Sequence, residues 1–104
     1  MRVMLDECVP ARLKSWLPDH EVETVTGIGW GGIKNGRLLR LLVERGFEVL
    51  VTADKNLEYQ QLLGGLPLAV LVLPTNHWKS LQPHKAPVCQ AFSSLQRGKV
   101  TRLD

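Results

Sequence analysis

The chain has 104 residues, of which 44% are hydrophobic and 22% are charged, and its formal net charge is +3. A chain of this length can bury roughly 65% of its unfolded surface, so residues 1–104 are expected to form a single domain. No apolar run approaches the ~20 residues of a membrane span, and the opening MRVMLDE places acids where a signal peptide needs an apolar stretch, so we expect a cytoplasmic protein that does not enter a membrane.

Short strands are expected where apolar or alternating runs are bounded by turn residues. These runs occupy residues 3–5, 20–25, 49–52, 66–73 and 98–103. The run at 66–73 is so apolar that both of its faces must be covered, which is typical of a parallel sheet between helices. The run at 98–103 is expected to be an edge strand.

Helices are expected between these strands. The first follows Pro10 and buries Leu13, Trp16 and Leu17. The second, which Asn35 can cap, buries Leu38, Leu41 and Leu42. The third occupies residues 57–63, and the last buries Val88, Phe92 and Leu95. Strands that alternate with helices predict a three-layer α/β/α domain with a mostly parallel, Rossmann-like sheet of four to five strands.

Two of the predicted strands end abruptly in acids. Asp6 and Glu7 follow the first strand, and Asp54 follows the third. In open parallel sheets, ligands bind in the crevice outside the carboxyl ends of the strands. If the first and third strands are neighbours, Asp6 and Asp54 converge in that crevice. The alternative is that each acid only caps the helix that follows it.

Converging carboxylates suit a hard divalent cation. Mg²⁺ or Mn²⁺ takes oxygen ligands, usually one or two carboxylates with water and substrate phosphates. A cation held in this way can polarise a phosphodiester and activate a water molecule. The acids therefore predict metal-dependent chemistry on a phosphate ester.

Three segments of the chain resemble a known family. LDECVP (5–10), IKNG (33–36) and TADKNLEY (52–59) resemble the short bacterial PIN-like domains, which are related to VapC-type toxin ribonucleases. The resemblance covers essentially the whole chain and implies a PIN-like fold that cleaves RNA with Mg²⁺ or Mn²⁺. It implies that Asp6, with Glu7 beside it, and Asp54 are the catalytic and metal-binding acids. The partners that it implies are RNA and a small antitoxin protein, and a homodimer is a further expectation.

Two positions depart from the pattern of that family. The family has an acid at the start of the second helix, where this chain has Asn35, and another two residues after Asp54, where it has Asn56. An asparagine can bind a cation through its carbonyl oxygen but adds no negative charge. Asn35 and Asn56 are therefore expected to be metal ligands of a weaker site, which Glu7 would strengthen only if it turned inward.

Other residues near the predicted crevice are expected to bind substrate. They are Lys34, Lys55, Trp30 and Tyr59. Lys55 could contact a phosphate and Trp30 could stack on a base, although a solvated lysine and a tryptophan packed over a helix are the alternatives. His77 and Trp78, after the fourth strand, could line the same crevice.

Gly27, Gly29 and Gly32 form the G-x-G-x-x-G pattern of dinucleotide-binding domains. This interpretation is disfavoured because the pattern follows the second predicted strand instead of the first. Trp30 would also crowd the turn that holds the pyrophosphate. Cys8 and Cys89 form no CxxC pair and are expected to be reduced thiols.

The positive charge is uneven along the chain. Residues 1–51 hold seven acids and seven bases, whereas residues 52–104 hold three acids and six bases, with no acid between Glu58 and Asp104. A basic surface near acidic strand ends suits an anionic ligand held through a metal, although a solvated surface explains the same pattern. Two functions therefore stay open: a metal-dependent endoribonuclease, and a PIN-like module that has lost catalysis and binds RNA or a protein.

Overall fold

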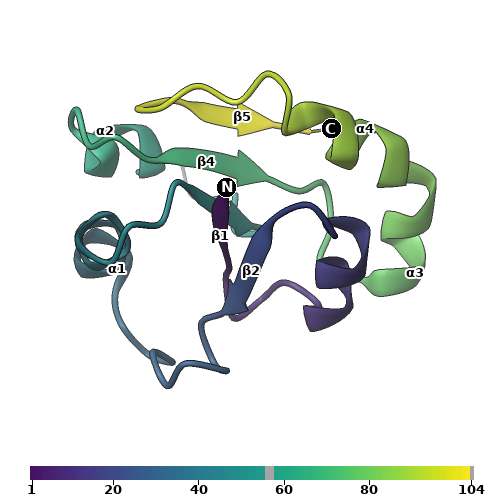
Figure 1. Cartoon of the computed structure of the whole chain (residues 1–104), viewed down its shortest axis with the longest axis horizontal. Coiled ribbons are helices and arrows are strands. Elements are labelled where there is room, and N and C mark those ends of the chain that lie inside the picture. Colours follow the sequence, from purple (N-terminus) through teal and green to yellow (C-terminus); the bar gives the residue numbers. More distant parts are fainter. Residues whose placement is uncertain (56–57, 104) are drawn as a thin grey trace.

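The computed structural model describes residues 1–55 and 58–103. Its centre is a five-stranded sheet whose strands are β1 (Arg2–Leu5), β2 (Glu21–Thr24), β3 (Val49–Thr52), β4 (Ala69–Val72) and β5 (Val100–Arg102). The order is β2-β1-β3-β4-β5, and every neighbouring pair is parallel (Figure 1). The predicted α/β class is confirmed, as are the edge position of β5 and the pairing of the first strand with the third.

Helices cover both faces of the sheet. They are η1 (a 3₁₀ helix, Ala11–Trp16), α1 (Asn35–Glu44), α2 (Tyr59–Leu63), α3 (Trp78–Leu81), η2 (a 3₁₀ helix, Gln82–His84) and α4 (Lys85–Ala91). One apolar cluster joins the sheet to α1 and α2, and a second joins it to η1, α3 and α4. The structure is therefore a three-layer α/β/α sandwich. In the part of the chain that the structure describes, no helix has the length and apolar character needed to cross a membrane.

The strands supply both clusters through their two-residue period. In β3, Val49 and Val51 face the cluster of η1, α3 and α4, whereas Leu50 faces that of α1 and α2. None of the three is more than 1% exposed. Successive side chains of a strand point to opposite faces, so an unbroken apolar run is what a sheet covered on both sides requires.

Three details differ from the sequence expectations. In α1 the buried leucines are Leu38, Leu39 and Leu42, while Leu41 is only half-buried. Asn35 is the first residue of α1 and Lys34 holds the N-cap position without a side-chain cap, so the predicted capping by Asn35 is wrong. The predicted last helix, which was to bury Val88, Phe92 and Leu95, corresponds to α4 but ends at Ala91, so Phe92 and Leu95 lie beyond it. The residues before it form α3 and η2, and Pro83 lies in the first turn of η2, where a proline needs no helical hydrogen bond.

Candidate functional site

An open cavity of about 570 Å³ lies at the carboxyl ends of β1 and β3. It is lined by Asp6, Glu7, Cys8, Asn35, Ala53, Asp54 and Asn76. After β1 the chain enters η1 in one helical layer, and after β3 it reaches α2 in the other. This divergence makes the β1–β3 boundary the topological switch point, where open α/β sheets bind ligands. The prediction that Asp6 and Asp54 share one crevice is confirmed.

The Asp6 carboxylate is held in place at both of its oxygen atoms. The Thr52 hydroxyl donates a hydrogen bond to Asp6 Oδ2 at 2.8 Å, and the Glu7 backbone N–H donates one to Asp6 Oδ1 at 2.9 Å. Thr52 is fully buried, and its hydroxyl also accepts a hydrogen bond from the Asp54 backbone N–H at 3.1 Å. One threonine at the end of β3 therefore couples the two acidic positions.

Neither Asp6 nor Asp54 holds the N-cap position of the helix that follows it. The N-cap residue of η1 is Pro10 and that of α2 is Glu58, and neither helix has a side-chain cap. The N-cap positions therefore do not support the capping alternative for either acid in the part of the chain that the structure describes. The hydrogen bonds of Asp6 instead hold its carboxylate at the wall of the cavity.

Glu7 also lines the cavity, but its side chain is exposed and contacts the glycine-rich loop. Glu7 Oε1 accepts a hydrogen bond from the Gly32 backbone N–H at 2.9 Å. Gly32 has a φ of +84°, a conformation that favours glycine. Glu7 thus fixes the loop to the end of β1, and the turn geometry accounts for Gly32 without a bound dinucleotide.

Sequence reasoning missed three residues of this site. Cys8 lines the cavity with its Sγ 3.6 Å from Thr52 Oγ1 and 3.9 Å from Asp6 Oδ2. Asn76 lines it from the segment after β4, next to β3 in the sheet. The strand-end rule that found Asp6 and Asp54 would also have found Asn76 had the strand order been known. In the sequence, Thr52 is marked only as the last residue of the strand expected at residues 49–52.

Tyr59 is buried close to the same polar group. Its side chain is 0% exposed, and within the described ranges its hydroxyl has no hydrogen-bond partner of normal geometry. Burial raises the pKa of the Tyr59 phenol to about 12, the nearby Thr52 hydroxyl lowers it, and the Asp6 and Asp54 charges raise it further. A residue buried to this degree does not fit the predicted contact with substrate.

The burial of Tyr59 gives a direct prediction, because this is the only tyrosine of the chain. In the native protein the phenol should titrate at about 12, against roughly 10 in the unfolded chain. The contribution of the Tyr59 phenol to the free energy of unfolding is then fully present below pH ~10. It is lost as the pH rises from there through ~12, because the unfolded state releases the proton first.

Ultraviolet difference absorbance of the phenolate measures this pKa directly. The decline of stability between these pH values should be shallower in Tyr59→Phe, which serves as the control. A native phenol whose pKa lies near the ordinary value of roughly 10 would mean that the hydroxyl is exposed to water.

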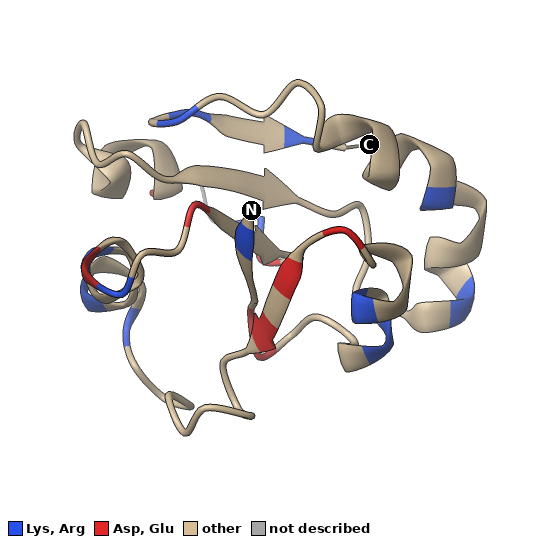
Figure 2. Ribbon diagram, in the orientation of Figure 1, with Lys and Arg blue, Asp and Glu red and all other residues tan. Residues whose placement is uncertain are grey.

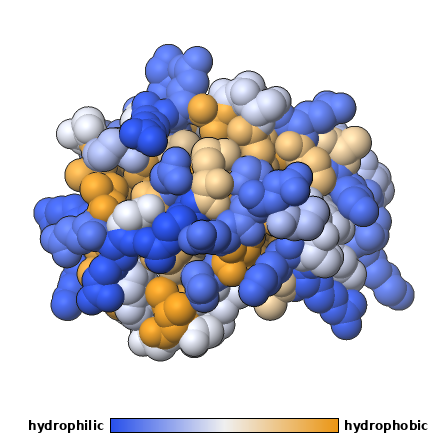
Figure 3. All heavy atoms as spheres, viewed as in Figure 1, coloured by the Kyte–Doolittle hydropathy of each residue, from blue (hydrophilic) through white to orange (hydrophobic). Residues whose placement is uncertain are grey.

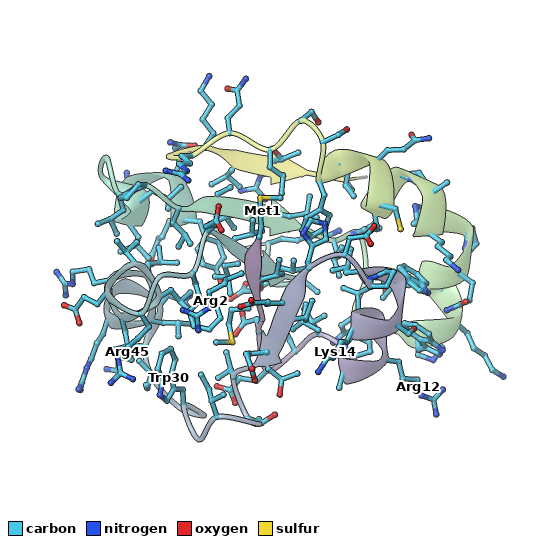
Figure 4. The ribbon with its side chains drawn as sticks, in the orientation of Figure 1. Met1, Arg2, Arg12, Lys14, Trp30 and Arg45 are labelled. Carbon is cyan, nitrogen blue, oxygen red and sulfur yellow. The ribbon has the colours of Figure 1, made fainter. Side chains whose placement is uncertain are left out.

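The other predicted substrate contacts lie elsewhere or stay untested. Trp30 packs edge-on against Phe47, with ring centroids 6.3 Å apart, and the Arg45 guanidinium lies 5.6 Å from its ring (Figure 4). It borders a separate cavity with Arg2, Glu23 and Phe47 and does not line the crevice at Asp6 and Asp54, so its predicted place in that crevice is wrong. Phe47 provides the apolar surface that draws the loop there.

Lys34 and Lys55 are exposed and are not among the residues that line the cavity, so their phosphate contacts stay predictions. Asn56 lies outside the described residues. Trp78 packs against Trp16 with ring centroids 5.1 Å apart, and His77 Nδ1 is 3.1 Å from Ser80 Oγ. Neither of these residues lines the cavity.

The side chains around the cavity carry the oxygen atoms that a hard cation prefers, but few of these side chains are charged. Asp6 and Asp54 supply carboxylates, and Asn35 and Asn76 supply amide carbonyls. Among residues 1–55 and 58–103, no three His, Cys, Asp or Glu side chains lie close enough together to hold one metal ion. The residues therefore fit a water-rich Mg²⁺ or Mn²⁺ ion bound by one or two carboxylates, and they do not form a cage of acids.

Comparisons of this chain with protein-family models, with curated proteins and with solved structures give no match.

Proposed function

We propose that the protein is a PIN-like, Mg²⁺- or Mn²⁺-dependent endoribonuclease of the cytoplasm. The observation that supports this proposal best is the pair Asp6 and Asp54 on one cavity at the β1–β3 switch point, coupled through Thr52. RNA is the substrate in this proposal. A small antitoxin protein is the proposed partner of a toxin of this type, and a second copy of the chain is the proposed homodimeric partner.

Each residue at the cavity has a distinct part in the proposal. Asp6 and Asp54 would hold the cation, and the amide oxygen of Asn35 or Asn76 would complete its ligands beside water. When bound, the cation would polarise the phosphodiester and lower the pKa of a water molecule. Because Thr52 and the Glu7 N–H fix the rotation of the Asp6 carboxylate, the site needs little reorganisation to accept the ion.

Two measurements on the purified protein test the proposal. Calorimetric titration should show weak binding of Mn²⁺, and a labelled single-stranded RNA should be cut internally when Mn²⁺ is present. A chelator should stop the cleavage. Cleavage that persists in excess chelator, or a protein that binds no Mn²⁺ and leaves RNA intact, would contradict the nuclease.

A second function is favoured by a specific feature of the site. The described part of the chain lacks a group of three acids that could hold one ion, and Asn35 stands where the resembled family has an acid. A PIN-like module that binds RNA or a protein without cutting would need no such cluster. RNA binding that is independent of Mn²⁺, with no cleavage, would support this second function.

A further inference from the structure

Four exposed cations lie on the helical layer that η1, α3 and α4 form. Arg12 and Lys14 lie on η1, Lys79 on α3 and Lys85 on α4, and all four are exposed. We call these four residues the basic helical face; their blue bands lie on the right of Figure 2. The structure records no ion pair for any of them among the residues that it describes. Residues 8–18 and 59–103 contain no Asp or Glu, so the segments that carry these four cations hold no acid of their own.

The helices that carry these cations are packed against one another. The rings of Trp16 and Trp78 are 5.1 Å apart, and Lys85 Nζ lies 6.0 Å from the Trp16 ring. The Cys89 thiol donates a hydrogen bond to the Trp16 carbonyl oxygen at 3.5 Å. These contacts join η1, α3 and α4 into one surface, on which the Lys85 ammonium lies over an indole ring.

The basic helical face begins where the cavity ends. Cys8 lines the cavity and the chain enters η1 at Ala11; Asn76 lines it and the chain enters α3 at Trp78. Both segments leave the cavity in the direction of the same helical layer. An extended anion seated in the cavity could therefore continue across these helices.

We propose that the basic helical face binds the backbone phosphates of single-stranded RNA on one side of the scissile bond. This inference rests on the proposed function, since it supposes that RNA occupies the cavity. Lysine and arginine side chains neutralise phosphates without reading sequence, and the half-buried Trp78 offers an indole on which a base can stack.

The surface argues for nucleic acid over a membrane. A helix that binds a lipid surface needs exposed apolar side chains as well as cations. Among the described residues, Met1 is the sole large hydrophobic side chain that is exposed. Figure 3 shows mostly hydrophilic atoms along the right-hand rim, where η1, α3 and α4 lie.

The experiment compares two double variants that lose the same charge. Arg12→Ala with Lys79→Ala removes two cations of the basic helical face, and Arg37→Ala with Arg40→Ala removes two from α1 in the opposite layer. Binding of a fluorescein-labelled single-stranded RNA is followed by fluorescence anisotropy in chelator, so that the RNA stays intact. Circular dichroism melts verify that both variants are folded.

The first variant should bind RNA about tenfold more weakly than wild type, and the control should stay within about twofold. Each phosphate contact adds about 0.7 to the slope of log affinity against log salt, so the first variant should lose about 1.4 of that slope. Equal losses in both variants, or no loss in either, would overturn the proposal. Binding to phosphatidylserine vesicles or to polyglutamate in place of RNA would also overturn it.

Failure of this inference can be distinguished from failure of the nuclease. RNA that binds through the basic helical face but is never cut with Mn²⁺ would support the face and contradict the nuclease. If the Arg12→Ala, Lys79→Ala variant cleaves RNA with an unchanged KM, RNA binding by the basic helical face is contradicted and the proposed nuclease function is not affected.

Discussion

Replacement of Asp54 by asparagine is expected to slow Mn²⁺-dependent RNA cleavage by about 100-fold or more. Loss of a residue that only orients a metal ligand typically costs 10–100-fold, so loss of a ligand should cost at least the upper part of that range. Asp6 and Asp54 are the two carboxylates proposed to hold the cation, whereas the Glu7 carboxylate is bonded to the Gly32 N–H, so the removal of one of the two takes away a large part of the attraction for the cation. Asp6→Asn should act in the same way.

The measurement is the single-turnover cleavage rate, together with calorimetric titration of Mn²⁺. Asp19→Asn provides the matched control, because it changes the same group in a second cavity lined by Met1 and His20. The control should cleave like wild type. If Asp54→Asn also cleaves at the wild-type rate, or if all three variants are slowed equally, the observed cleavage does not come from this cavity.

The two acids could be found from the sequence because each follows a buried apolar run. A parallel sheet places all carboxyl ends at one edge, so position in the chain was enough to locate Asp6 and Asp54. Asn76 could not be found with the same certainty. It follows β4 by several residues, past Pro74, and its place at the cavity depends on β4 lying beside β3.

Aromatic residues were harder to place, because short elements carry little periodicity. Tyr59 begins a five-residue helix, in which one turn cannot show which face is buried, and it is fully buried. Trp30 lies in a loop without any period, and only the fold brings Phe47 close enough to pack against it. The sequence predicted the helix or loop in which each aromatic residue lies, but not the side chains against which it packs.

The basic helical face could not be predicted from the sequence either, because segments that are far apart in the chain form it. Arg12 and Lys14 belong to the half of the chain in which acids and bases balance, so a charge count along the sequence marks only residues 52–104 as basic. The contact between Trp16 and Trp78 brings η1 beside α3 and joins the two groups of cations. Such a surface depends on packing between segments that are distant in the sequence.

Asn35→Asp is expected to raise the affinity for Mn²⁺ about tenfold. Asn35 lines the cavity with Asp6 and Asp54, so the change adds a carboxylate where the resembled family has one. A new charge ~4 Å from the cation is worth up to about 4 kcal/mol at a surface-like dielectric. Desolvation and repulsion among the acids reduce this gain, which leaves about 1–2 kcal/mol, or roughly tenfold.

Without metal, two effects of this substitution oppose each other. The new carboxylate is repelled by Asp6 and Asp54, but it also lies in the first turn of α1, where a negative charge gains about 0.3–1 kcal/mol from the helix dipole. The melting temperature of the metal-free protein is therefore a poor test. The rise of the melting temperature on addition of Mn²⁺ is a better one, because a ligand that binds only the native state stabilises it in proportion to its affinity.

The melting temperature should thus be measured with and without Mn²⁺ for wild type, Asn35→Asp and Gln61→Glu. Gln61 is exposed on α2, so its replacement makes the same amide-to-acid change away from the residues that line the cavity. The metal-induced rise should be larger in Asn35→Asp than in the other two proteins. If the rise is the same in all three, Asn35 is not a ligand position, and the module that binds without cutting becomes the better account of the site.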